Sequence, residues 1–287
     1  MNGPVSAAGP AVQLPRENVY GHSRKARLVL EALARLREDR AQVLDVLDVG
    51  CGNGSALTRF LAARGDRVLG IDTHAPSIEY AKRQFGMAGL AFRQVDCEAM
   101  LAEAQRFDTI VCADVLEHLP HPEAALSCVE RLLRPGGRLV VTIPNGFGPF
   151  ELESWLSRMP VFGTASLWVV DHVTAVLNRF VLRGAWTAVV TPPDLPYNAE
   201  CGHVQFFTRG ALLRMAARCG LTMLRQTGVS WLSGPYTNYL FAPSRLFCQV
   251  NARAGEWLPS WMLSAWFFEF GRAADASSSG TGTDFRW

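Results

Sequence analysis

This 287-residue chain lacks the sequence features that mark membrane-spanning, secreted and nucleic-acid-binding proteins. No run of about 18 apolar residues occurs, so we expect no transmembrane helix. Residues 1–13 contain neither a basic segment nor an apolar one, which argues against a signal peptide. Lysine and arginine form no block, and the net charge of +2 favours no polyanionic partner. We therefore expect no nucleic acid among the partners of this protein.

Paired cysteines are missing as well. The chain has seven scattered cysteines, an odd number, and no Cys-x-x-Cys motif. This number and spacing of cysteines is typical of reduced thiols, several of them buried as small apolar residues. It favours a cytoplasmic protein.

The chain does contain short apolar segments that alternate with helical patterns. Strands are expected at 43–49, 67–72, 90–95, 107–112 and 138–143, with helices between them. This spacing predicts right-handed βαβ crossovers and a parallel sheet, and hence an α/β fold. The alternation stops after strand five and returns with Thr208 as a helix N-cap and a strand at 221–227.

We expect one domain over residues 16–272. Residues 1–15 and 273–287 have the composition of a disordered lead-in and a disordered tail. Residues 146–200 form an insertion rich in Trp, Phe and Val. Three interpretations of it stay open: a lid over an acceptor pocket, a surface that touches a membrane holding a lipid substrate, and ordinary packing on the sheet.

The most informative stretch runs from Val46 to Gly54. An apolar strand leads into a turn in which Gly50, Gly52 and Gly54 alternate with other residues, and a helix is expected from Ser55. Glycine lets the backbone approach a ligand closely, and a helix N-terminus offers free N–H groups. The stretch therefore predicts a cofactor site.

The spacing of this turn argues against a dinucleotide. The pattern Gly-x-Gly-x-x-Gly requires Gly or Ala at position 55 when counted from Gly50, or at position 57 when counted from Gly52, and this chain has Ser55 and Leu57 there. Asp48 precedes the glycines and suits a cationic amino group. Asp72, at the end of the second strand, can accept hydrogen bonds from ribose hydroxyls. Asp96 and Cys97 are placed to meet an adenine edge, so the ligand is expected to be S-adenosylmethionine (SAM).

Several motifs in order carry a family resemblance. The sequences LDVGCGNG at 47–54, GID at 70–72, FDTIVC at 107–112, LEHL at 116–119 and LLRPGG at 132–137 resemble those of class I SAM-dependent methyltransferases. The most similar branch is the small-molecule one, typified by the ubiquinone and menaquinone biosynthesis enzymes. The resemblance covers residues 20–145 and 203–225 and barely extends to 146–200 and 228–287.

This resemblance implies a Rossmann-like, doubly wound, seven-stranded sheet. It is mostly parallel with an antiparallel last strand at 265–271, and a helical insertion follows strand five. SAM would lie beyond the carboxyl ends of the strands, and S-adenosylhomocysteine (SAH) would be the product. Cofactor contacts are expected from Asp48, Gly50, Cys51, Gly52, Asn53, Gly54, Asp72, Thr73, Asp96, Cys97 and Asp114.

His118 is the candidate catalytic residue, as a general base for a hydroxyl nucleophile. It could instead only hydrogen-bond or pack, because the sulfonium is already an activated donor. We also considered Asp114, Glu117, His118 and His121 as metal ligands. Pro120 and Pro122 prevent one helix from presenting them together, and the spacing fits no zinc pattern, so no metal is expected.

The sequence thus predicts an enzyme that transfers the SAM methyl group to a small-molecule or lipid-like acceptor. Oxygen is the favoured acceptor atom, while carbon and nitrogen stay open. A non-catalytic or regulatory SAM-binding protein and a dinucleotide-dependent oxidoreductase are the alternatives from other classes. The protein could also contact a membrane peripherally through 146–200, and the sequence leaves its oligomeric state open.

Overall fold

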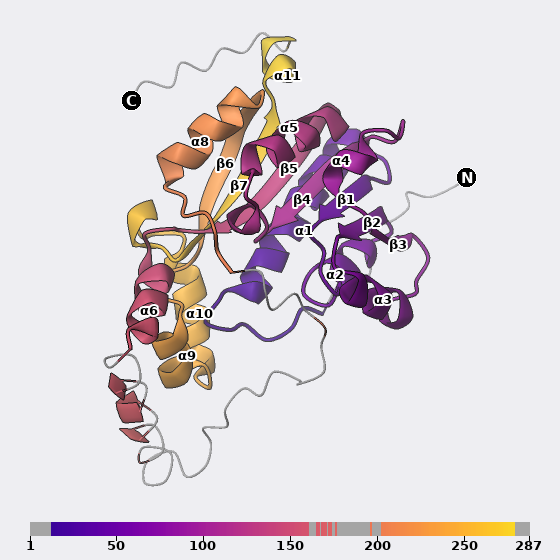
Figure 1. Ribbon diagram of the computed structural model, residues 1–287. Coiled ribbons are helices and arrows are strands. Elements are labelled where there is room, and N and C mark those ends of the chain that lie inside the picture. Colours follow the sequence, from indigo (N-terminus) through magenta and orange to yellow (C-terminus); the bar gives the residue numbers. More distant parts are fainter. Residues whose placement is uncertain are drawn as a thin grey trace, which may run out of the picture.

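The computed structural model describes residues 13–160, 165–166, 168–170, 172–173, 176, 196 and 202–278 (Figure 1). Its centre is a seven-stranded sheet in the order β3-β2-β1-β4-β5-β7-β6. The strands are β1 Asp45–Val49, β2 Arg67–Asp72, β3 Leu90–Gln94, β4 Phe107–Ala113, β5 Leu133–Pro144, β6 Leu221–Ser230 and β7 Ala265–Arg272. The first five strands pair in parallel, as the sequence predicts.

Helices cover both faces of the sheet (Figure 1). Their bounds are α1 His22–Arg40, α2 Thr58–Ala62, α3 Ala75–Gln84, α4 Cys97–Met100, α5 Pro122–Leu132, α6 Pro149–Arg158, α8 Arg209–Arg218, α9 Pro235–Phe241, α10 Arg245–Ala254 and α11 Ala273–Ser278, with short 3-10 turns η1 Leu116–His118 and η2 Ser260–Met262. Apolar side chains of α4, α5 and α8 pack on one face of the sheet. Those of α1 and α2 pack on the other face.

The central strands are buried on both faces, which explains their continuous apolar character. Every residue of β4 from Phe107 to Cys112 is buried, and so is β1 after Asp45. Because β2 and β4 flank β1 on its two sides, the chain reverses its winding direction beside β1. Ligands in such sheets bind beyond the carboxyl ends of the strands at this point.

The helix after the glycine turn begins later than predicted. The sequence places its start at Ser55, but α2 begins at Thr58. The reason is local: the Asn53 side chain accepts hydrogen bonds from the backbone N–H of Ser55 (3.1 Å) and from its hydroxyl (2.5 Å). Such a side-chain turn competes with helical hydrogen bonding.

Strand β7 confirms the antiparallel strand predicted at 265–271. It pairs antiparallel with β5 on one side and with β6 on the other. The alternation of aromatic residues here also suggests an edge strand, and that prediction is wrong, because β7 lies inside the sheet. Both of its faces carry buried aromatic side chains, among them Trp266, Phe267 and Phe268.

The structure agrees with some predictions for the C-terminal segments and corrects others. A helix expected at 239–257 is interrupted near Pro243, and the structure has α9 and α10 on either side of it. Part of the expected disordered tail is the helix α11, whose Asp275 side chain accepts a hydrogen bond from the Gly136 N–H (2.8 Å). Residues 1–12 and 279–287, and most of 161–201, lie outside the described residues. Among those described, no helix is both long and apolar enough to cross a membrane.

Candidate functional site

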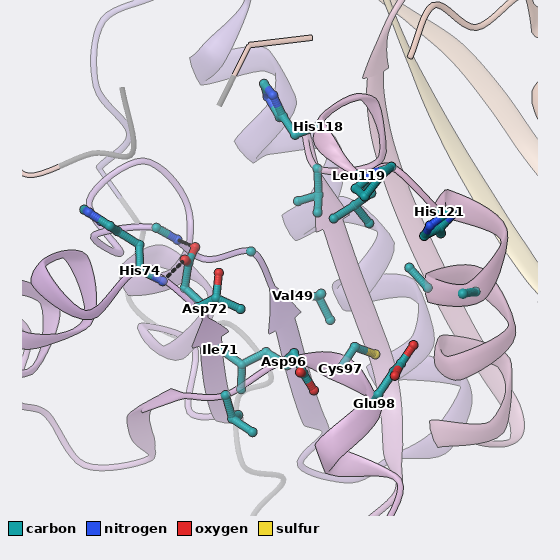
Figure 2. Close-up of a pocket in the computed structure, with 18 of the residues that line it drawn as sticks. Val49, Ile71, Asp72, His74, Asp96, Cys97, Glu98, His118, Leu119 and His121 are labelled. Atoms are coloured by element: carbon teal, nitrogen blue, oxygen red, sulfur yellow. Dashed lines mark hydrogen bonds between the residues drawn. The ribbon is translucent and has the colours of Figure 1, made fainter. Parts of the chain in front are cut away.

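A cavity of about 510 Å³ opens at the carboxyl ends of the parallel strands. Figure 2 shows Asp72, Asp96 and Cys97 at the ends of adjacent segments and His118 with Leu119 beyond them. The lining comprises Val49, Gly50, Gly52, Ile71, Asp72, Thr73, His74, Ser77, Val95, Asp96, Cys97, Glu98, Asp114, Val115, His118, Leu119, Pro120, His121, Ala124 and Ala125. Many of the residues that the sequence assigns to the cofactor therefore meet in one place.

The glycine turn forms one wall of this cavity. Gly50 has a φ of 70°, and a Cβ there would lie 2.6 Å from a methyl carbon of Val115. Only glycine combines this left-handed backbone with so close a contact. Gly52 has a φ of 53°, and a Cβ there would meet no atom within 4 Å, so open space lies beside it. This space is available to a ligand.

Asp72 links the turn to the second strand. Its two carboxylate oxygens accept hydrogen bonds from the N–H groups of Gly52 and His74, each at 2.8 Å. Each oxygen keeps a further lone pair for a donor in the cavity. The side chain is therefore held in place and can still accept hydrogen bonds from ligand hydroxyls.

The far end of the cavity is built around α4. Asp96 caps this helix by accepting a hydrogen bond from the Ala99 N–H (2.7 Å). Cys97 is buried and also lines the cavity. Ala124 and Ala125 of α5 complete this end, which is largely apolar apart from Asp96 and Glu98.

A second cavity of about 110 Å³ adjoins the first and shares Gly50 and Asp114 with it. Its lining includes His22, Lys25 and Asp48. Unlike the first cavity, it therefore brings a lysine close to carboxylates. That charge pattern suits a ligand with both an amino and a carboxylate group.

The Asp114 side chain, where the two cavities meet, is held by an ion pair and a hydrogen bond. Its φ is 55°, an uncommon left-handed backbone for a residue with a side chain. The carboxylate forms an ion pair with Lys25 and accepts a hydrogen bond from the Thr142 hydroxyl (3.0 Å). Burial alone would raise the pKa of Asp114, but the Lys25 ammonium and these hydrogen bonds hold it below its ordinary value. Asp114 is therefore ionised.

Asp48 differs from Asp114. Its side chain is buried and accepts a hydrogen bond from the Thr58 hydroxyl (2.7 Å). Burial first, and the nearby Asp72 charge second, raise the pKa of Asp48 to about 7. Near neutral pH the permanent negative charge beside the second cavity therefore belongs to Asp114 more than to Asp48.

A network of four side chains lies on the side of the larger cavity that carries His118; they belong to Glu117, His118, Glu151 and His203. The Nδ1 atom of His118 lies 3.1 Å from the Gly202 carbonyl oxygen, and Nδ1 of His203 lies 2.6 Å from a Glu151 carboxylate oxygen. Both partners only accept, so both Nδ1 atoms carry a proton; in a neutral imidazole with that tautomer the Nε2 atom has the lone pair. Glu117 is buried beside them, and its Oε2 atom has no hydrogen-bond partner in the described structure. Burial, with the Asp114 charge, raises the pKa of Glu117 to about 8.

This network bears on the expected absence of a metal. One ligand atom each from Glu117, His118 and His203 lie within 4.8 Å of one another, so these side chains could hold a divalent ion. The set differs from the one considered in the sequence, since Asp114 and His121 are not part of it. His203 comes from a distant segment, which sequence spacing does not reveal.

The structure separates the predicted cofactor residues into groups. Gly50, Gly52, Asp72, Thr73, Asp96, Cys97 and Asp114 line the larger cavity, while Asp48 and Cys51 line the smaller one. Asn53 and Gly54 belong to the lining of neither; Gly54 faces the Phe92 ring, and Asn53 donates a hydrogen bond to the Pro196 carbonyl (3.0 Å). Their roles as cofactor contacts stay predictions.

Sequence reasoning places His203 at the far wall of the pocket, as a base, an orienting group or a structural histidine, but it missed Lys25 and Glu151. Lys25 lies 89 residues from Asp114, and Glu151 lies 52 residues from His203. No local pattern marks either contact. The family resemblance implies that the segment before the first helix, with Tyr20, His22 and Arg24, closes over the cofactor or the substrate. Of these residues His22 lines the smaller cavity.

Comparison with known proteins agrees with this geometry. The family model described as "Methyltransferase domain" matches residues 20–226. The chain belongs to this methyltransferase family. Ubiquinone biosynthesis O-methyltransferases of Stutzerimonas stutzeri and Leptothrix cholodnii are 37% identical over 103 residues and 36% identical over 106 residues. These alignments cover 35% and 36% of this methyltransferase, and the chain spans only 44% and 45% of the relatives' lengths.

Solved methyltransferases share the fold at low sequence identity. PKMT2 from Rickettsia typhi, in complex with AdoHcy, has a TM-score of 0.54 and 17% identity, covering 81% of this chain and 49% of its own. A SAM-dependent methyltransferase from Clostridium acetobutylicum has a TM-score of 0.50 and 13% identity, covering 87% and 91%. Family and fold together make this a class I SAM-dependent methyltransferase domain.

Proposed function

We propose that this protein transfers the methyl group of SAM to an oxygen atom of a small-molecule acceptor. The observation that carries the proposal is the pair of joined cavities at the carboxyl ends of β1 and β4. The larger has a carboxylate at the end of β2 and an apolar far end, and the smaller has a lysine paired with a carboxylate. These environments match the three parts of SAM: ribose, adenine and a zwitterionic methionine end.

In this arrangement Asp72 accepts hydrogen bonds from the ribose hydroxyls, and the α4 end around Asp96 and Cys97 receives the adenine. The methionine end enters the smaller cavity, where its ammonium group faces Asp114 and its carboxylate faces Lys25. The sulfonium then lies near the junction that Gly50 and Asp114 share. His118 lines the larger cavity and would face the acceptor.

His118 is the proposed general base. Its Nδ1 proton is directed at the Gly202 carbonyl, so Nε2, which lies 4.0 Å from a Glu117 carboxylate oxygen, is the atom that would accept the proton of an acceptor hydroxyl. As the acceptor oxygen attacks the methyl carbon in line, Nε2 takes the hydroxyl proton. The C–S bond breaks with its electron pair moving to sulfur, which leaves SAH. Oxygen acceptors are also supported by the names of the ubiquinone O-methyltransferases that share part of the sequence.

Binding and turnover are tested separately. Calorimetry should detect SAH binding to the wild type, and Asp72→Ala should weaken it by about 10²-fold or more because a positioned charged acceptor is lost. Asp45→Ala is a control variant with a carboxylate removed at the opposite end of β1, and it should bind SAH as the wild type does. Absence of SAH binding by the folded wild type would refute the cofactor assignment.

The acceptor atom is tested with radiolabelled SAM and matched phenol, aniline and carbon-nucleophile acceptors. His118→Ala should lower kcat on hydroxyl acceptors by about 10²-fold while leaving SAH affinity unchanged, because only proton transfer is lost. The assay is repeated in EDTA, where the rate should persist. Loss of activity in EDTA with recovery on adding Mg²⁺ or Zn²⁺ would instead make His118, with Glu117 and His203, a metal ligand.

A further inference from the structure

Two buried cysteines meet behind the adenine end of the cofactor cavity. The sulfur atoms of Cys97 and Cys128 lie 2.9 Å apart, and the Cys128 thiol is 2.8 Å from the Cys97 carbonyl oxygen. Cys97 begins α4 and lines the cavity, whereas Cys128 lies on α5 and is not part of the lining. The pair thus has one member that a small molecule in the cavity can reach and one directly behind it.

The helices that carry these cysteines also shape the cavity. Asp96, Cys97 and Glu98 line it from the start of α4, and Ala124 and Ala125 line it from α5, one turn before Cys128. A disulfide brings two sulfur atoms to about 2.05 Å, so the bond would draw them together by roughly 0.9 Å. This movement would displace the start of α4 relative to α5 at the adenine end.

We propose that Cys97 and Cys128 form a reversible disulfide that switches off cofactor binding, with hydrogen peroxide as the class of oxidant. This inference rests on the proposed placement of SAM in the larger cavity. Cysteine disulfides in cytosolic proteins are typically transient and redox-sensing, which fits a pair whose bond is made only under oxidation.

The disulfide forms in two steps. The Cys97 sulfur attacks one peroxide oxygen, the O–O bond breaks, and water leaves with Cys97 oxidised to the sulfenic acid. The Cys128 sulfur then attacks the Cys97 sulfur, the S–O bond breaks, and a second water leaves. Two thiols lose two electrons and two protons in all, and one peroxide becomes two waters. The hydrogen bond between the two thiols lowers the pKa of Cys128 and, together with burial, raises the pKa of Cys97. Cys128 therefore ionises first and can accept the Cys97 proton as the Cys97 sulfur attacks.

The state of the cavity should control the reaction. In the cofactor-free enzyme the cavity gives peroxide access to Cys97. Bound SAH would cover that wall and exclude peroxide from it. Saturating SAH should therefore slow the oxidation, and this protection would not occur at a cysteine away from the cavity.

The test compares reduced and peroxide-treated protein. Oxidation of the wild type should weaken SAH binding by about tenfold or more, as an ångström-scale displacement at a binding site does, and dithiothreitol should restore it. Cys128→Ser should keep its SAH affinity when reduced and should form no disulfide at Cys97 after peroxide treatment. Cys248→Ala, a buried cysteine on α10, is the matched control and should stay as sensitive as the wild type.

Mass spectrometry provides a readout that does not depend on a variant folding. Trypsin should leave Cys97 in the peptide 94–106 and both Cys112 and Cys128 in the peptide 107–131, so fragmentation must assign the linked residue. A 97–128 link that SAH suppresses supports the switch. A different link, no link, or loss of SAH affinity without the 97–128 link would overturn it. Normal SAH binding by the reduced enzyme keeps such a failure distinct from failure of the cofactor assignment.

Discussion

Asp48, Asp114 and Glu117 lie close to the cofactor end and have different charge states. Asp114 is ionised because Lys25 and Thr142 stabilise its charge. For Asp48 and Glu117 burial dominates and raises the pKa values to about 7 and about 8. Charge at this site is therefore concentrated on the Lys25–Asp114 pair, which faces the proposed methionine end of SAM.

Glu117→Gln should change how stability depends on pH. The pKa of the Glu117 carboxyl rises from its ordinary value of 4.5 to about 8 in the folded protein. Between these two pH values the folded state therefore holds one proton more than the unfolded state. The stability that this proton contributes is full below about pH 4.5 and is lost as pH rises through 8. Urea unfolding between pH 5 and 9 should show a flatter decline in the variant than in the wild type.

The control for this prediction is Glu123→Gln on α5. Glu123 is exposed, and its hydrogen bond with Arg218 lowers its pKa rather than raising it. Its replacement should leave the decline in stability between pH 5 and 8 as in the wild type. Equal slopes for wild type and Glu117→Gln would contradict a protonated Glu117 in the folded protein.

Residue identities could be predicted only where the signal is local. The predicted cofactor site follows from two local signals: the alternation of Gly50, Gly52 and Gly54, and the acidic residues that end β2 and precede α4. The charge on each carboxylate could not be predicted, because it depends on burial and on Lys25, which is remote in sequence. The partner of His203 could not be predicted either, because Glu151, to which the His203 Nδ1 proton is directed, lies in the insertion.

At the scale of elements, β6 and the end of α10 touch backbone to backbone. A Cβ on Gly228 would lie 2.2 Å from the Gly255 carbonyl oxygen and 2.4 Å from a methyl carbon of Leu263. The Gly228 N–H also donates a hydrogen bond to that carbonyl (3.1 Å). Two glycines are thus needed where this helix end meets the sheet.

Gly228→Ala should destabilise the protein by about 1–3 kcal/mol, because the backbone of α10 cannot move away without losing its hydrogen bond. Chemical denaturation measures this change in the free energy of unfolding. Gly86→Ala is the matched control, since nothing lies within 4 Å of a Cβ there, and it should change stability by less than about 0.5 kcal/mol. Similar stabilities for the two variants would show that β6 and α10 do not pack this closely.

Element positions can be predicted well where periodicity is clear. The five parallel strands and β7 follow from apolar segments bounded by turns. The start of α2 is misplaced because the Asn53 side chain closes a turn that periodicity does not register. The interior place of β7 is also hidden, since one sequence pattern can serve an edge strand or a central one until its neighbours are known.

At the scale of the molecule, exposed tryptophans collect on elements that follow the fifth strand. Trp155 of α6 is 60% exposed, Trp257 after α10 is 77% exposed and Trp261 of η2 is 72% exposed. Asn145 donates hydrogen bonds to the Trp261 and Leu263 carbonyls, which joins the segment before α6 to η2. Figure 1 shows α6, α9 and α10 gathered together beside one end of the sheet.

This surface makes peripheral membrane contact testable. We expect the protein to float with vesicles that contain anionic lipid, because tryptophan favours the membrane interface and Arg158 and Arg253 lie on the same elements. Replacing Trp155, Trp257 and Trp261 by serine should reduce flotation. Val43→Ser, which removes an exposed apolar side chain before β1, should not. Flotation that is absent in the wild type would rule out this contact.

The position of β7 also has a consequence for the order of assembly during synthesis. Strand β6 joins the sheet only through β7, which leaves the ribosome about forty residues later. The five parallel strands, complete by residue 144, can pair as they emerge, whereas β6 must wait with its edge exposed. A nascent chain that stops before Ala265 would then have its cofactor end assembled and its last two strands missing. The edge of β6 accordingly stays unpaired from its own synthesis until β7 is made.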